Sequence, residues 1–263
     1  MRLKIYQVDA FSAYVFSGNP AAVIPLKHWL DDATMQAIAA ENNLAETAFF
    51  IAKDDHYHLR WFTPTQEVPL CGYATLASAL IVFTKLAMSR QAVKFETLSG
   101  MLEVRRSANG DLTMVLPKLE PLSCNTPANL VEGLGLAPTE VLLTEVDTNY
   151  YAIYNNENEV RSIMPDLMML EKLHPFGVVV TAEGEEVDFV SRYFAPGYGI
   201  PEDPVTVSIH CALIAFWSKK LGKQKMLARQ ISKRGGELAC EELQDQVLVS
   251  GHATIYLEGE ITV

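Results

Sequence analysis

The chain has 263 residues, of which 49 % are hydrophobic and 20 % charged, a composition ordinary for a soluble protein with one large domain or two of usual size. Its formal net charge of −11, without a lysine or arginine cluster, argues against nucleic-acid binding, and an acidic surface disfavours anionic membranes. The longest apolar run, near 74–82, is much shorter than the roughly 20 residues that cross a bilayer.

In the first half, alternating apolar residues predict strands, and apolar residues three or four apart predict helices. We expect strands at 4–11, 21–26, 48–52, 58–62, 93–105 and 111–116, and a helix at 31–42. An almost continuous apolar segment predicts a further helix over 74–88. A helix that is apolar on all sides belongs in a core, so we expect the strands to surround it.

The second half is predicted to repeat this order. We expect strands at 140–146, 150–154, 178–181, 188–194, 226–232, 237–240, 246–249 and 253–257, and helices at 166–173 and 208–221. The helix at 208–221 is again strongly apolar. Segment 117–121, which begins and ends with proline, is the expected linker between the halves.

The chain contains a copy of one of its own segments. Segment 60–64, Arg-Trp-Phe-Thr-Pro, returns at 192–196 as Arg-Tyr-Phe-Ala-Pro, 132 positions later. This offset is about half the chain and exceeds the roughly 20–50 residues of solenoid and propeller repeats, so it predicts two equivalent domains. Each copy precedes the apolar helix of its half. We therefore expect the turn before each helix to line a ligand cleft.

The candidate binding residues belong to the turns that begin these two helices. They are Gly72, Tyr73, Ala74 and Thr75 in the first half, and Asp203 and Ser208 in the second. Free amides of a helix's first turn and the helix dipole attract anions, so the turns could hold a carboxylate and stabilise an enolate-like charge. The alternative is that Thr75, Asp203 and Ser208 only cap their helices.

Glu46 is the candidate proton carrier, because its neighbours at 42–50 are mostly small or apolar. Burial raises the pKa of a carboxyl toward the working pH, which suits a general acid or base. The alternative is an exposed glutamate on a strand. Cys71 could be a thiolate at a helix start, or simply a small core residue. Gly236, in a glycine pair, could let the backbone approach a ligand.

Metal and cofactor signatures are missing from the sequence. The cysteines at 71, 124, 211 and 240 form no CxxC pair, and no His, Cys and carboxylate set has metal-ligand spacing. There is no Gly-rich dinucleotide or phosphate fingerprint. We therefore expect no metal and no cofactor. The first residues read as a strand rather than a signal peptide, so we expect a cytoplasmic protein with reduced thiols.

Several segments together resemble the PhzF-like (phenazine biosynthesis-type) isomerases, relatives of diaminopimelate epimerase. They are segments 8–11, 18–21, 44–49, 60–64, 70–72, 201–206, 234–238 and 250–253. The resemblance implies an α+β, diaminopimelate epimerase-like fold of two pseudo-symmetric barrel-like domains, each wrapped around a central apolar helix. We expect one domain at 1–117, joined by a C-terminal strand at 252–263, and the other at 122–251.

The resemblance also implies a function. By this resemblance we expect a cofactor-independent isomerase or epimerase, commonly a homodimer, that transfers a proton on a small carboxylate-bearing metabolite. The family's catalytic glutamate matches Glu46, and its substrate-binding aspartate and helix-start serine match Asp203 and Ser208. Tyr73 stands where the family usually has histidine, Val207 where it usually has glycine, and Ile209 where it usually has alanine.

These departures keep alternative functions open. One alternative is a catalytically impaired protein that binds or senses a small molecule on the same scaffold. A thiol-dependent racemase that uses Cys71 is a third hypothesis.

Overall fold

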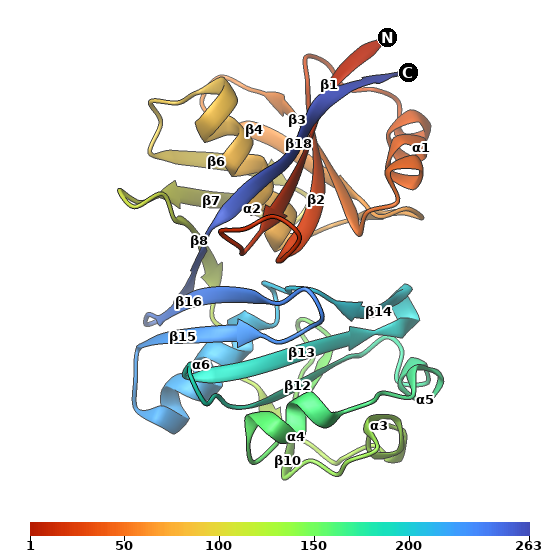
Figure 1. The fold of residues 1–263 in the computed structure, drawn as a ribbon, viewed down its shortest axis with the longest axis vertical. Coiled ribbons are helices and arrows are strands. Elements are labelled where there is room, and N and C mark those ends of the chain that lie inside the picture. Colours follow the sequence, from red (N-terminus) through yellow and green to blue (C-terminus); the bar gives the residue numbers. More distant parts are fainter. The chain divides into compact units, whose positions relative to one another are not determined.

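The computed structural model describes residues 1–263, which divide into two compact units. Unit 1 comprises Met1–Val115 and Ser250–Val263, and unit 2 is Leu116–Val249. Both chain ends belong to unit 1, where β1 (Arg2–Ala10) and β18 (Ala253–Thr262) pair antiparallel (Figure 1). The unit boundaries fall within a few residues of the predicted ones, except that the expected linker 117–121 belongs to unit 2.

Unit 1 contains one sheet, one outer helix and one central helix. Its other elements are β2 (Asn19–Leu26), α1 (Asp32–Asn42), β3 (Glu46–Ala52), β4 (Tyr57–Phe62), β5 (Glu67–Val68), α2 (Gly72–Ile81), the π-helical turn η1 (Val82–Leu86), β6 (Ala92–Thr97), β7 (Gly100–Arg106) and β8 (Leu112–Pro117). The strands pair in the order β18-β1-β2-β3-β4-β6-β7-β8, with β2–β3 and β4–β6 parallel and the other pairs antiparallel.

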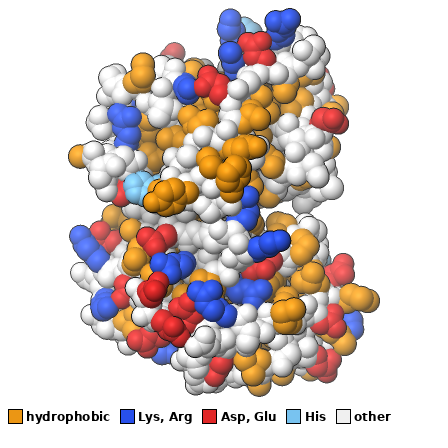
Figure 2. Space-filling view, viewed as in Figure 1, with side chains coloured by type: hydrophobic (Ala, Val, Ile, Leu, Met, Phe, Trp, Pro, Cys, Tyr) orange, Lys and Arg blue, Asp and Glu red, His pale blue; other side chains and the backbone are white.

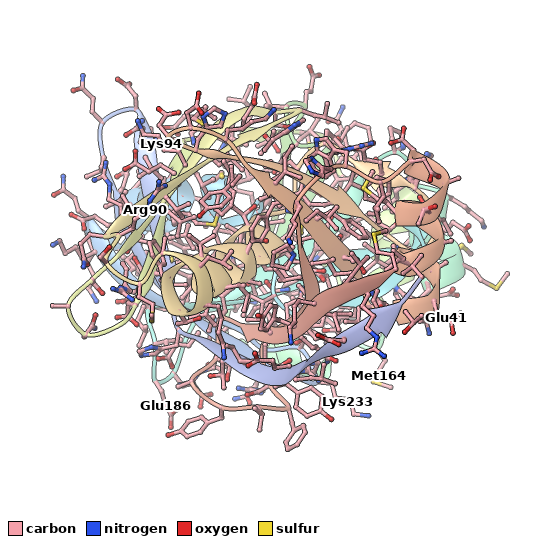
Figure 3. All side chains as sticks on the ribbon, turned by 90° about the horizontal axis from the view of Figure 1, so that it is seen from above. Glu41, Arg90, Lys94, Met164, Glu186 and Lys233 are labelled. Atoms are coloured by element: carbon pink, nitrogen blue, oxygen red, sulfur yellow. The ribbon has the colours of Figure 1, made fainter.

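The apolar helix α2 lies at the centre of unit 1, as the sequence predicts. It packs against β1, β2, β3, β7 and β18, and its side chains from Tyr73 to Ala79 are all buried. The other face of the sheet is covered by α1, whose Met35, Ile38 and Ala39 pack on strand residues such as Ile24. In Figure 3, Glu41 on α1 lies at the edge of this unit opposite Arg90 and Lys94.

Unit 2 is built from a comparable set of elements. They are β9 (Leu122–Ser123), α3 (Ala128–Leu134), β10 (Glu140–Thr144), β11 (Asn149–Ile153), α4 (Glu157–Ser162), α5 (Leu167–Glu171), β12 (Gly177–Glu183), β13 (Phe189–Ala195), the 3₁₀ turn η2 (Pro196–Tyr198), β14 (Ile200–Asp203), α6 (His210–Leu221), β15 (Lys225–Gln230), β16 (Gly236–Glu242) and β17 (Gln246–Gly251). The apolar helix α6 packs against β15 and β16. The outer helices α3, α4 and α5 pack on the other face of the sheet in a separate apolar cluster.

The strand order of unit 2 repeats that of unit 1. Strands β10-β11-β12-β13-β15-β16 pair with the same alternation of directions as β1-β2-β3-β4-β6-β7, with β11–β12 and β13–β15 parallel. The short strands β5 and β14 add to β4 and β13 in the same way. The duplication predicted from segments 60–64 and 192–196 is therefore present in the topology of each unit.

The copied arginine makes the same contacts in both units. Arg60 donates through Nε and Nη2 to the two carboxylate oxygens of Glu67, each at 2.7 Å. Arg192 donates in the same way to Glu202, at 2.7 and 3.2 Å. Each guanidinium also lies over the Phe two residues further on, about 5 Å from the ring centre. These pairs hold β5 and β14, the strands that lead into the two central helices.

Some predicted elements differ from the observed ones. The first central helix begins two residues earlier than predicted, at Gly72, and changes to a π-turn after Ile81. The second begins at His210, so Ser208 lies in the turn before it. The single strand predicted at 93–105 is a hairpin, because the chain reverses between Thr97 and Gly100, where φ is 95°. None of the helices has the length and hydropathy that a membrane span requires.

Candidate functional site

Glu46 is buried, with 8 % of its surface exposed, at the first residue of β3. The alternative of an exposed strand glutamate is therefore wrong. Glu46 lies opposite Ala21 of the parallel strand β2, and the flanking Thr47 hydroxyl accepts a bond of 3.1 Å from Asn42. Two other buried polar residues, Asp9 and Asn19, lie at this end of the sheet.

The central helix α2 begins at the same end of the sheet as Glu46. The start of β3 pairs with the end of β4, which in turn pairs with β5, and the chain enters α2 four residues after β5. The N-cap Cys71 makes no capping bond with its side chain, and the first turn contains no acidic residue. The positive end of the helix dipole is therefore not compensated by a nearby carboxylate of the helix itself.

Tyr73 and Thr75 use their hydroxyl groups differently in this first turn. Thr75 Oγ1 donates to the Cys71 carbonyl, so Thr75 does not cap the free amides. Tyr73 is 5 % exposed, yet its hydroxyl makes no hydrogen bond with the protein. Buried hydroxyl groups normally have a partner. Tyr73 Oη is therefore a donor available for a ligand, and the free amides of Gly72, Tyr73 and Ala74 belong to the same helix turn.

In unit 2, the turn before α6 is held by a buried glutamine. Gln230 is fully buried; its Oε1 accepts from the Thr206 amide at 2.8 Å, and its Nε2 donates to the Asp203 carbonyl at 2.8 Å. Thr206 Oγ1 donates to the Asp203 carboxylate. The Asp203 side chain is thus held within its turn by Thr206. Sequence reasoning missed Gln230, although an amide in an apolar strand is a recognisable signal.

Ser208 and His210 have distinct roles in the start of α6. Ser208 is half-buried and precedes the helix; its hydroxyl caps no amide. His210 is fully buried, with Nδ1 2.7 Å from the Thr206 carbonyl, to which it donates. Burial lowers the pKa of His210 to about 4, so the ring is neutral at pH 7. His210 is a packed residue, while Ser208 leaves its hydroxyl available.

Gly236 is brought to the same turn by pairing between strands. It lies opposite Gln230 in the β15–β16 ladder. Ser232, in the loop between these strands, donates to the Pro204 carbonyl at 2.8 Å and accepts from the Gly235 amide at 3.1 Å. Gly235 has φ of 66°, which favours glycine. Asp203, Ser208 and Gly236 therefore belong to one region of unit 2.

Tyr193 is a further residue of this region that the sequence analysis used only as part of the repeat. It pairs with Asp203 across β13 and β14. Burial, and then the nearby Asp203 carboxylate, raise the pKa of Tyr193 well above its usual value of 10. The hydroxyl therefore stays protonated and can only donate or accept a neutral hydrogen bond. No three His, Cys, Asp or Glu side chains are grouped in a way that could hold a metal ion.

Comparison with known proteins identifies relatives of this chain. The family model for phenazine biosynthesis-like protein (PhzC-PhzF) matches residues 8–259. An uncharacterized isomerase of Pseudomonas aeruginosa is 46 % identical over 261 residues, with 99 % of each chain covered. The crystal structure of a PhzF family phenazine biosynthesis protein from Enterococcus faecalis matches all of both chains, with 40 % identity and a TM-score of 0.96.

A more distant structure supports the wider fold assignment. A hydroxyproline epimerase from Agrobacterium vitis is 10 % identical, covers 99 % of this chain with 92 % of its own, and has a TM-score of 0.67. At this identity the likeness concerns the fold alone. The α+β fold is therefore diaminopimelate epimerase-like, as the sequence resemblance predicted.

Proposed function

The chain belongs to the PhzF family of phenazine biosynthesis-like proteins, and we propose that it is a cofactor-independent isomerase that transfers a proton on a small carboxylate-bearing metabolite. The burial of Glu46, at the end of the sheet where α2 begins, is the observation that carries this proposal. The names of the relatives support the reaction class, since several are called isomerases.

In the proposed reaction, the Glu46 carboxylate takes a proton from a carbon atom next to an electron-withdrawing group. The electron pair of the broken C–H bond moves into an enolate-like system, and the protonated Glu46 then returns the proton to another carbon atom or to the other face. The uncompensated amides of α2, with the Tyr73 hydroxyl, stabilise the developing negative charge. No net oxidation occurs, so the reaction needs no redox partner.

The resemblance to the family also assigns substrate binding to the turn of unit 2. We propose that Asp203, Ser208 and Gly236 bind the polar groups of the substrate, with the turn kept rigid by Gln230. Rigid support of this kind favours precise orientation of a reacting group. Removing the Ser208 hydroxyl should therefore raise KM more than it lowers kcat.

Replacement of Glu46 tests the proposed role directly. A thermal-shift screen of small carboxylic acids first identifies a ligand, which is then incubated with the protein in D₂O and followed by NMR. Glu46→Gln should lower deuterium incorporation into carbon by about 10²–10⁴-fold, because general acid/base catalysis is lost, while the melting temperature stays nearly unchanged. Glu41→Gln, an exposed residue of α1 in the same unit, is the matched control and should keep full exchange.

The alternative function, small-molecule binding without catalysis, is favoured by one observation. Tyr73 stands where relatives of this type usually carry histidine, and a hydroxyl with a pKa near 10 is a poor proton shuttle at neutral pH. A ligand that raises the melting temperature but gains no deuterium from the wild-type protein would support this alternative. Exchange that persists in Glu46→Gln would instead remove Glu46 from the mechanism.

We also propose that the protein is a homodimer, as its resemblance to the family implies. Sedimentation equilibrium should then give twice the 29.2 kDa of one chain. A mass of one chain across the micromolar range would contradict the proposal. The result is independent of the proton-transfer test, because each experiment has its own readout.

A further inference from the structure

Unit 1 contains a cavity that the proposed reaction does not use. Its volume is about 730 Å³, within the usual range for small-molecule sites. It is lined by the first residues of β1, the last residues of β2 and β3, and Leu86 at the end of η1. Glu46 begins β3, and Gly72 begins the central helix. The cavity therefore lies at the other end of both, roughly 20 Å from Gly72 along the helix.

The floor of this cavity is apolar and aromatic. Tyr6, Phe50 and Tyr57 form it with small exposed fractions, and the half-buried Trp29 lines its side. Phe50 and Tyr57 are fixed in an edge-to-face contact with ring centres 5.3 Å apart. Trp29 is fixed by His58 and by the guanidinium of Arg60, 5.4 Å from its ring. The floor is thus an ordered surface for a flat apolar body.

The charged residues that line the cavity are all basic, although the whole chain carries −11. Arg2 and Lys4 lie within 4.0 and 3.1 Å of Glu260 and are partly neutralised. The neighbouring Glu258 is paired with Lys85. Lys27 and His28 are exposed and form no ion pair. Figure 2 shows this mixture of basic and acidic side chains at the top of the view, the end of unit 1 where Figure 1 marks the chain ends.

We propose that this cavity binds an amphipathic organic monoanion. Its aromatic or alicyclic body would lie against Trp29 and Leu86, above the buried rings of Tyr6 and Phe50, and its carboxylate or sulfonate would lie beside Lys27 and His28. The concave shape and volume favour a small molecule over a peptide. The missing counter-charge at Lys27 favours an anion over a neutral ligand, since charge-assisted hydrogen bonds to a lysine are stronger than neutral ones.

Two dyes of the same shape test the proposal. The first, 8-anilinonaphthalene-1-sulfonate, carries one negative charge, whereas N-phenyl-1-naphthylamine is its neutral counterpart. The anionic dye should bind with blue-shifted emission. Lys27→Glu should weaken that binding by about tenfold or more and leave the neutral dye nearly unaffected. Lys94→Glu makes the same charge change on β6, outside the cavity, and is the matched control.

A blocking variant and a competitor complete the test. Leu86→Trp, at the cavity edge, should prevent the binding of both dyes, and 1-naphthoate should displace the anionic dye from the wild type. Equal effects of Lys27→Glu and Lys94→Glu would overturn the proposal. So would displacement by an acidic peptide but not by 1-naphthoate. Glu46→Gln should leave dye binding intact. If dye binding were lost in Glu46→Gln but kept in Lys27→Glu, the dye would bind at the candidate active site, and the proposed cavity site would be refuted.

Discussion

His210 shows how burial decides the chemistry of a single residue. A histidine two positions after a serine at a helix start could be read as a catalyst. In the structure it is fully buried, packs near Phe189 with its ring tilted, and donates to the Thr206 carbonyl. Its pKa of about 4 leaves it neutral in the folded protein across the physiological range. The residue therefore contributes to stability rather than to proton transfer.

This burial predicts an acid-sensitive stability. The folded-state pKa of His210 is about 4, below the unfolded value of 6.5, so its stabilising effect is full above pH 6.5 and is lost as pH falls toward 4. The loss amounts to roughly 3 kcal/mol. His210→Asn, which can still donate to Thr206, should flatten the dependence of unfolding free energy on pH between 6.5 and 4 in urea titrations. His28→Asn, on an exposed residue that forms no ion pair, should keep the wild-type slope.

At the level of elements, the duplicated arginines, Arg60 and Arg192, differ in the contacts that they make beyond their glutamates. Beyond its glutamate, Arg60 contacts the exposed Asp32 at 2.9 Å. Arg192 instead donates through Nη1 to the carbonyls of Val160 and Ile163, at 3.2 and 2.8 Å, where α4 ends. These carbonyls have few other partners at a helix C-terminus. Arg192 thus binds the carbonyls at the end of a helix, whereas Arg60 does not.

Lysine substitution should expose this difference. Lysine keeps the charge but loses the planar fork that binds a carboxylate and two carbonyls at once. Arg192→Lys should lower the unfolding free energy by about 2–3 kcal/mol, because buried groups lose partners. Arg60→Lys should lower the free energy of unfolding by about 1 kcal/mol, because Asp32, the other partner of Arg60, is exposed. Urea unfolding followed by circular dichroism measures both, and equal losses would contradict the argument.

The sequence predicted the elements that have long, regular patterns. The two central helices, the strands around them and the repeat at 60–64 and 192–196 all follow from apolar periodicity and copied residues. The short helices α3 and α4 were not predicted, because Gly133 interrupts the first and Val160 is the one apolar residue of the second. Glu202 was not predicted as the partner of Arg192. It lies 135 positions after Glu67, so the repeat offset of 132 does not align the two glutamates.

The candidate site was predictable to a smaller extent. The resemblance pointed to Glu46, Asp203 and Ser208, and the structure buries the first two. Which side chains support them depends on contacts between distant segments, such as Gln230 with Thr206, and no local pattern reveals these. The capping role considered for Thr75 was wrong, because its hydroxyl bonds back to a carbonyl, and Asp203 binds Thr206 within its own turn.

At the scale of the whole molecule, the two units differ in how the chain builds them. Unit 2 is one continuous segment with its own apolar cluster beneath α3, α4 and α5. Unit 1 needs two segments, because β18 comes from the C-terminal end of the chain and pairs with β1 from Arg2 to Ala10. The register shifts once, between Gln7 and Val8. The order of the chain therefore makes unit 1 depend on its last residues.

Fragments should reveal this dependence. Residues 116–249 alone should show cooperative thermal unfolding by circular dichroism, because they retain the whole apolar cluster beneath α3, α4 and α5. Residues 1–115 alone should not, because β1 loses the strand that pairs along its whole length and Tyr6 loses its neighbour Glu258. Adding a peptide of residues 250–263 should restore the cooperative transition in 1–115, with a midpoint that rises with peptide concentration. A fragment 1–115 that folds equally well without the peptide would show that β18 is dispensable.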